Sequence, residues 1–181
     1  MEELTLTAAR DRMLERIAST RAVLDRGLPH WASGETGEWT TTPDGDWTGG
    51  AYVGQLWLAH RVDPARFPAE IAGQALALMR PRLPHRTAFK GFGFYYGAAI
   101  ASVLFGDETA RDLALRAADL LLSMYDERLG LIPLGGDAEE ASEVGEAQSS
   151  IDSLQAYALL AWAADETGDP EYDRVAERHL E

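Results

Sequence analysis

The stretch 45–59, GDWTGGAYVGQLWLA, combines helical spacing of apolar residues with glycines inside the expected helix. Gly49, Gly50 and Gly54 each cost about 1 kcal/mol relative to alanine in a helix interior, so some interaction must offset them. The run Leu-Trp-Leu that follows has no polar break, which predicts a helix buried on most sides. Two interpretations stay open: the glycines allow close helix packing, or they admit a flat ligand that stacks on Trp47.

Composition narrows the class of protein. The 181 residues predict one domain spanning 1–181, and 16 basic against 30 acidic residues give a net charge of −14. That charge argues against a nucleic-acid or anionic-membrane partner. The absence of cysteine excludes disulfides and thiolate zinc sites. The first residues lack the pattern of a secretory signal, and no apolar run approaches a membrane span. We therefore expect a cytoplasmic protein.

The remaining pattern is helical, with nearly all-apolar helices alternating with amphipathic ones. Tight turns at Asp63-Pro64, Gly106-Asp107 and Gly168-Asp169-Pro170 separate the two helices of each pair. No long strand is indicated, and 28–46 reads as a loop. The fold class is therefore all-α, with helical hairpins packed side by side, apolar helices inside and amphipathic helices outside. The expected helices cover 7–26, 47–61, 64–80, 92–104, 108–127, 150–167 and 170–181.

The long loops 28–46, 82–91 and 130–149 each precede an inner helix. This order predicts that the N-termini of the inner helices converge on one mouth, where the helix dipoles favour anions.

Several separated motifs resemble the unsaturated glucuronyl hydrolases of glycoside hydrolase family 88, in that family's order and over nearly the whole chain. They are Trp-Thr-Gly-Gly from Trp47, Gly93-Phe94, Ser-Ile-Asp-Ser-Leu around Asp152, and Glu-Thr-Gly-Asp-Pro from Glu166. The resemblance implies an (α/α)6 toroid. It also implies a reaction in which an aspartate protonates the C4=C5 double bond of an unsaturated uronic acid and water adds at C5. The product then opens and releases the next sugar.

Carried over by position, the resemblance makes Asp152 the general acid and base. A carboxyl at the N-terminus of a buried helix suits that role, because desolvation raises its pKa and the helix dipole lowers it; the alternative is an ordinary helix cap. The resemblance likewise implies that Trp47 stacks on the sugar, the alternative being a core indole. Lys90 and Phe94 are the further candidates for substrate binding.

The chain departs from the family at Lys90-Gly91-Phe92-Gly93-Phe94, where the family has His-Asp-Leu-Gly-Phe. Gly91 therefore replaces the second active-site aspartate. Lys90 replaces a histidine, and it either meets an anionic group or lies on the surface, as lone lysines usually do.

The chain offers about three hairpins and a leading helix, roughly half a toroid and similar to the N-terminal half of the family. It is either completed by another polypeptide or a truncated segment, and an open half exposes apolar inner helices, which predicts a homo-oligomer or a second half-toroid chain. The alternative function is a non-catalytic binding or interaction module. No cofactor is expected, and no metal, because the four histidines lack ligand spacing.

Overall fold

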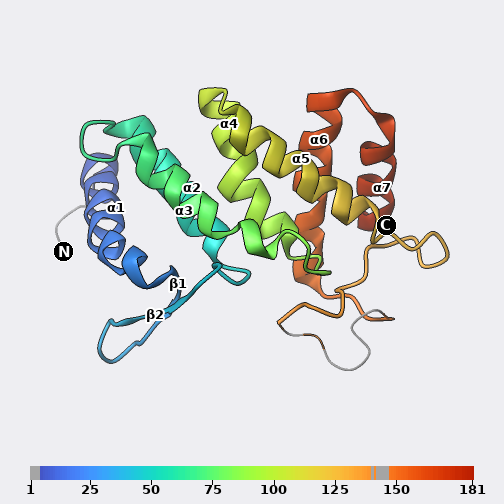
Figure 1. Cartoon of the computed structure of the whole chain (residues 1–181), viewed down its shortest axis with the longest axis horizontal. Coiled ribbons are helices and arrows are strands. Elements are labelled where there is room, and N and C mark those ends of the chain that lie inside the picture. Colours follow the sequence, from blue (N-terminus) through green and yellow to red (C-terminus); the bar gives the residue numbers. More distant parts are fainter. Residues whose placement is uncertain (1–4, 140, 142–146) are drawn as a thin grey trace.

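The computed structural model describes residues 5–139, 141 and 147–181. Its helices form two layers (Figure 1). The inner layer consists of α2 (Gly49–Val62), the π-helix η3 (Gly91–Ala99) continued by α4 (Ile100–Phe105), and α6 (Gln155–Thr167). The outer layer consists of α3 (Ala69–Leu78), α5 (Glu108–Leu122) and α7 (Pro170–Leu180), and α1 (Leu6–Thr20) packs beside α2. The all-α class with its two layers of hairpins is confirmed.

The glycines of the inner layer serve close packing. A Cβ atom on Gly50 would lie 2.5 Å from Gly93 Cα, and one on Gly54 would lie 2.8 Å from the carbonyl oxygen of Tyr96. The backbones of α2 and η3 therefore touch where they cross. Of the two interpretations of the glycine-bearing helix, close packing is the one that these positions support.

Aspartate caps begin two of the outer helices as predicted. The Asp107 carboxylate accepts a hydrogen bond from Ala110 N at 2.9 Å, and the Asp169 carboxylate accepts one from Glu171 N at 2.9 Å. The prediction for the first turn was wrong, since the helix after Asp63 begins only at Ala69. A second proline, Pro68, disfavours helical geometry in the residue before it, so 63–67 form a turn instead.

One further expectation about local structure was wrong, and another helix differs in its winding. The predicted loop 28–46 contains an antiparallel hairpin, β1 (Leu28–Ala32) and β2 (Trp39–Thr42). Its Trp and Thr residues are good strand formers, and β1 buries Leu28 under α2. The predicted helix 92–104 begins as a π-helix, a winding that is rare and often found at functional sites.

The ends of the chain's helical layers also carry short 3₁₀ segments. Helix α1 passes into η1 (Arg21–Arg26), η2 (Arg80–Arg82) follows α3, and η5 (Ile151–Leu154) precedes α6. The hairpin and the long loops lie along one edge of the molecule, where the inner helices begin (Figure 1). The N-termini of the inner helices therefore lie at the same edge of the molecule, as predicted.

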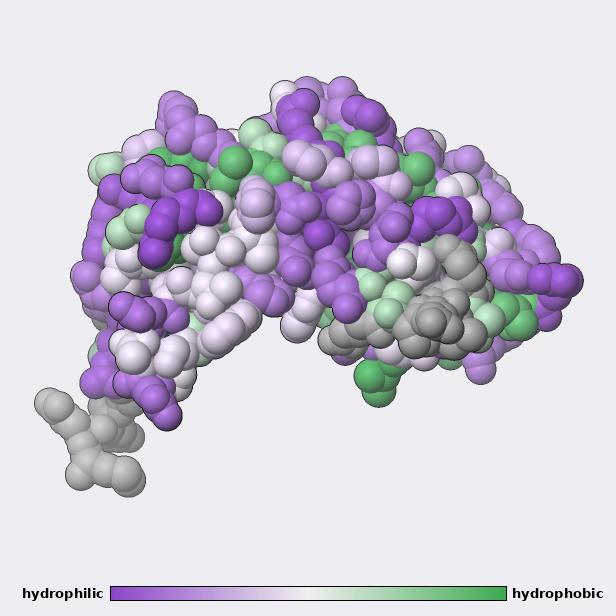
Figure 2. All heavy atoms as spheres, turned by 60° about the horizontal axis from the view of Figure 1, so that its bottom comes forward, coloured by the Kyte–Doolittle hydropathy of each residue, from purple (hydrophilic) through white to green (hydrophobic). Residues whose placement is uncertain are grey.

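The inner helices expose apolar side chains. Leu58 and Val62 on α2, Val103 on α4, and Leu154 and Tyr157 at the start of α6 are all exposed. Seen from the mouth, the molecule has an arched outline with a hollow on one side, as expected for part of a ring (Figure 2). None of the helices within residues 5–139, 141 and 147–181 has both the length and the apolar character of a membrane-spanning segment.

Candidate functional site

Trp47 lies at the mouth, just before α2, and is half-buried. Its ring packs on Phe92 and Phe89, with centroids 5.8 and 6.2 Å away, and the edge of His30 approaches it at 6.2 Å. Aromatic neighbours on several sides hold the indole in one orientation. A fixed, partly exposed indole can stack on the apolar face of a sugar ring.

The backbone that carries Trp47 is itself constrained. Asp46 has a φ of 50°, a left-handed conformation that costs about 1 kcal/mol or more for a residue other than glycine. Its carboxylate accepts a hydrogen bond from Trp47 N at 2.7 Å. The strained residue therefore helps to orient the indole.

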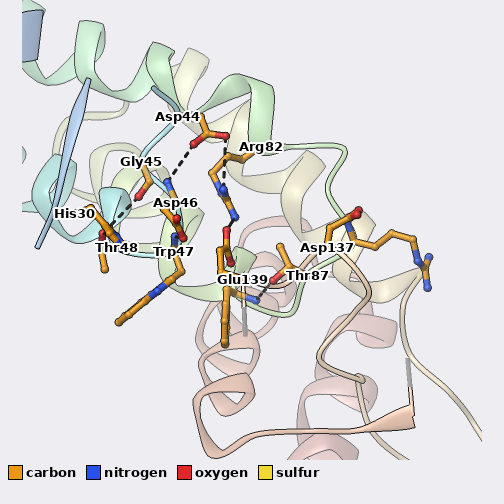
Figure 3. A network of polar contacts seen from close by, with 12 residues as sticks. His30, Asp44, Gly45, Asp46, Trp47, Thr48, Arg82, Thr87, Asp137 and Glu139 are labelled. Carbon is orange, nitrogen blue, oxygen red and sulfur yellow. Dashed lines mark hydrogen bonds and ion pairs between the residues drawn. The ribbon is translucent and has the colours of Figure 1, made fainter. Parts of the chain in front are cut away.

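Beside Trp47, a network of charged groups joins three segments (Figure 3). Arg82 is buried, lies 3.5 Å from the Asp44 carboxylate and donates a hydrogen bond to Glu139. Burial, together with the neighbouring Asp46 carboxylate, raises the pKa of Glu139. Arg82 thus ties the loop before α2 to the loop after α5. Neither Arg82 nor Glu139 could be predicted as a site residue, because nothing in their local sequence links them.

Lys90 is the single lysine of the chain and is only 3% exposed, so it does not lie on the surface. Within the described residues, its ammonium has no hydrogen-bond or ion-pair partner. Burial, followed by the nearby Arg82, lowers the pKa of Lys90 to about 8. The side chain lines a cavity of about 10 Å³ shared with Asp46 and Thr87. That space is about enough for one water molecule, so a larger ligand would have to displace part of its cover.

Gly91 has no room for a side chain. A Cβ atom there would lie 2.6 Å from Ala156 N and still closer to the carbonyl of Gln155. The start of η3 therefore touches the backbone at the start of α6. Packing of this chain requires glycine at the position where the family carries its second aspartate.

Phe94, the other sequence candidate for substrate binding, is 2% exposed and belongs to the main core. It also borders the small cavity next to Lys90. Its proposed role in binding stays a prediction, and the observed packing assigns it to the support of η3.

Asp152 is exposed and lies on η5, the 3₁₀ turn that leads into α6. The turn is held by a hydrogen bond from Ser153 N to the carbonyl of Ser150 at 3.0 Å. Its neighbour Ile151 is 81% exposed, so water reaches this turn freely. The carboxylate is thus positioned by its backbone and is exposed to solvent and to a ligand.

The η5 turn is also held from α7. The buried His179 donates from Nε2 to the carbonyl of Ser153 at 2.9 Å, and its Nδ1 accepts from Ile132 N at 3.1 Å. These partners fix a neutral imidazole with its proton on Nε2. In the part of the chain that the structure describes, no group of three or more His, Asp or Glu side chains could hold a metal ion.

These features define the class of protein first: half of an (α/α) toroid with a mouth at the inner helix N-termini. Solved structures agree. The chain aligns with an aspartate-to-asparagine variant of UGL with dGlcA-Glc-Rha-Glc at a TM-score of 0.82 and 31% identity, covering 97% of this chain and 47% of that one. It also aligns with unsaturated glucuronyl hydrolase from Bacillus sp. GL1, at a TM-score of 0.77 and 32% sequence identity. This alignment covers 92% of this chain and 45% of that one.

Within that class, the chain resembles the unsaturated glucuronyl hydrolases, as its motifs indicated. It is 34% identical over 156 residues to the unsaturated glucuronyl hydrolase of Bacillus sp. (strain GL1), covering 84% of this chain and 41% of that protein. It is 32% identical over 139 residues to an unsaturated chondroitin disaccharide hydrolase of Streptococcus pneumoniae. The matched region is 75% of this chain and 34% of that protein. The chain therefore spans less than half the length of these relatives. No protein-family model matches it.

Proposed function

We propose that this chain supplies half of an (α/α) toroid that hydrates the C4=C5 double bond of an unsaturated uronic acid at the end of an oligosaccharide. The observation that carries the proposal is the exposed Asp152 on η5, three residues before Gln155, whose backbone packs against Gly91 beside Phe92, the ring partner of Trp47. The names of the relatives support the substrate class, since they act on unsaturated glucuronyl and chondroitin disaccharide compounds.

In this mechanism, the sugar ring stacks on Trp47 and presents its double bond to Asp152. The protonated carboxyl of Asp152 delivers its proton to C4. The resulting carboxylate takes a proton from a water molecule as that water adds at C5, which restores the acid. The hydrated ring then opens and releases the next sugar. The water molecule that acts as the nucleophile can reach C5 because the η5 turn is exposed to solvent.

A second function of a different class is favoured by Gly91. Because packing leaves no room for a second carboxylate there, one contact expected in the family is absent. The alternative is a binding module that holds the same sugars without turnover.

The exposed apolar side chains of α2, α4 and α6, among them Leu58, Val103 and Tyr157, support a partner that covers them, either a second copy or a second set of hairpins. Sedimentation velocity at micromolar concentration tests self-association. A dimer or larger species supports a homo-oligomer, and a stable monomer supports a separate second half.

Loss of ultraviolet absorbance of an unsaturated uronide disaccharide tests the activity, with the chain alone and with any natural second half. We expect Asp152→Asn to slow turnover by about 10²–10⁴-fold. Asp165→Asn, at an exposed aspartate further along α6, is the matched control and should keep full activity. Turnover that persists unchanged in Asp152→Asn would refute this mechanism, and binding without turnover in the unmodified protein would favour the binding module.

A further inference from the structure

A second concave site lies between α1, the β-hairpin and α2. This hairpin pocket has a volume of about 220 Å³ and is lined by Arg16 of α1, His30 and Trp39 of the hairpin, and Thr48 and Gln55 around the start of α2. Pockets for drug-sized ligands have roughly 300–1,000 Å³. The hairpin pocket is therefore of a size for one small ring.

The side chains of the pocket suit both the apolar C–H face and the hydroxyl groups of a sugar ring. Trp39 offers a partly exposed indole, which can cover the C–H face of a pyranose. Gln55 offers an amide with donors and an acceptor for ring hydroxyls. His30 Nδ1 and Thr48 Oγ1 form a hydrogen bond of 3.0 Å, so both are oriented at the pocket wall.

The pocket also contains a cation without a counter-ion. No carboxylate pairs with Arg16 within the described residues, and the chain as a whole carries a net charge of −14. A guanidinium forms bidentate hydrogen bonds with planar or tetrahedral anions such as carboxylate and sulfate. The ring that fits this pocket best therefore carries an anionic substituent.

The hairpin pocket adjoins the mouth. His30 lines the pocket and also contacts Trp47 edge-on, and Thr48 directly follows Trp47 in the chain. Figure 3 shows His30 and Thr48 beside Trp47 at one end of the polar network. A ligand with two linked rings could therefore place one ring at Trp47 and the other in the pocket.

We propose that the hairpin pocket is a second subsite that binds a sugar ring bearing a carboxylate or sulfate, next to the ring held at Trp47. The inference rests on the proposed function for its substrate class. The binding itself requires no double bond, which allows it to be tested separately.

The test uses saturated probes and the indole N–H signals of the five tryptophans in two-dimensional NMR. Methyl β-glucuronide and the 6-sulfate of methyl β-galactoside are the anionic probes, and methyl β-glucoside is the uncharged one. We expect the Trp39 signal, assigned with Trp39→Phe, to shift on addition of at least one anionic probe. Which of the two binds more tightly identifies the anion as carboxylate or sulfate.

Arg16→Gln should weaken the binding of that anionic probe about tenfold, the size expected for loss of a charge-assisted hydrogen bond. Its effect on the uncharged probe should be small. Arg12→Gln, one turn earlier on the same helix and outside the pocket, makes the same change in net charge and should leave binding unchanged. Because Arg16 is exposed, the substitution should not disturb folding.

No shift at Trp39 with either anionic probe, or equal affinities in the unmodified chain and Arg16→Gln, would overturn the subsite. Such a result together with hydration that depends on Asp152 would leave the proposed function intact. Binding that depends on Arg16 in a chain without hydration would support the subsite and count against the enzyme.

Discussion

The starts of η3 and α6 meet at the same mouth but are built in opposite ways. At the start of η3, Lys90 is buried and Gly91 touches the backbone of the next inner helix. At the start of α6, Asp152 and Ile151 are exposed on a short turn. One start is closed by packing, whereas the other is open to water and ligand.

This contrast explains why the chain departs from the family pattern at Gly91. If Gly91 were a simple loss of a catalytic carboxylate, space for that carboxylate would remain. The space is instead occupied by the backbone of Gln155 and Ala156. The start of η3 thus holds the mouth together, and the start of α6 carries the exposed carboxylate to which our proposal assigns the chemistry.

The largest effect is expected from Gly91→Ala. The added methyl would overlap the Gln155 carbonyl, and neither backbone can move without disturbing η3 or α6. We expect the free energy of unfolding to fall by about 3 kcal/mol or more, measured by urea denaturation. The control is Gly73→Ala on α3, where nothing lies within 4 Å of the added atom and stability should rise by about 0.5–1 kcal/mol. Equal behaviour of the two variants would contradict the closed start of η3.

Next in size is His179→Phe, which probes the open start of α6. Phenylalanine fills a similar space but leaves the Ile132 N–H and the Ser153 carbonyl without the partners that they have in the structure. We expect the free energy of unfolding to fall by about 2 kcal/mol. We also expect faster amide hydrogen exchange in 150–154. Unchanged exchange there would show that α7 does not hold the η5 turn.

The smallest effect is the pH dependence contributed by Lys90. Because its pKa is lowered to about 8 in the folded chain, the unfolded chain binds more protons between about pH 8 and its ordinary pKa near 10.4. Stability from this group therefore rises with pH across that window. Relative to that of Lys90→Met, the free energy of unfolding of the unmodified chain should rise by about 1–2 kcal/mol between pH 8 and 10. A constant difference between the two proteins would mean that Lys90 is not desolvated.

The order of helices and the mouth could be predicted, because apolar periodicity and the caps at Asp107 and Asp169 are local signals. The hairpin was missed because its Trp and Thr residues lie between turn-forming residues in a segment with mixed signals. The buried Lys90 departs from the usual exposure of lysine, because groups distant in the sequence, such as Asp46 and Asp137, lie around it. Likewise, the requirement for Gly91 depends on a contact with α6, some 60 residues further along the chain.

The most direct test measures turnover and stability together in Asp152→Asn. If the start of α6 carries the chemistry, hydration of an unsaturated uronide should fall at least about 100-fold. The free energy of unfolding should stay within about 0.5 kcal/mol of the unmodified chain, as for an exposed residue. Unchanged turnover, or a loss of stability comparable with that of Gly91→Ala, would contradict the assignment of chemistry to α6 and of structure to η3.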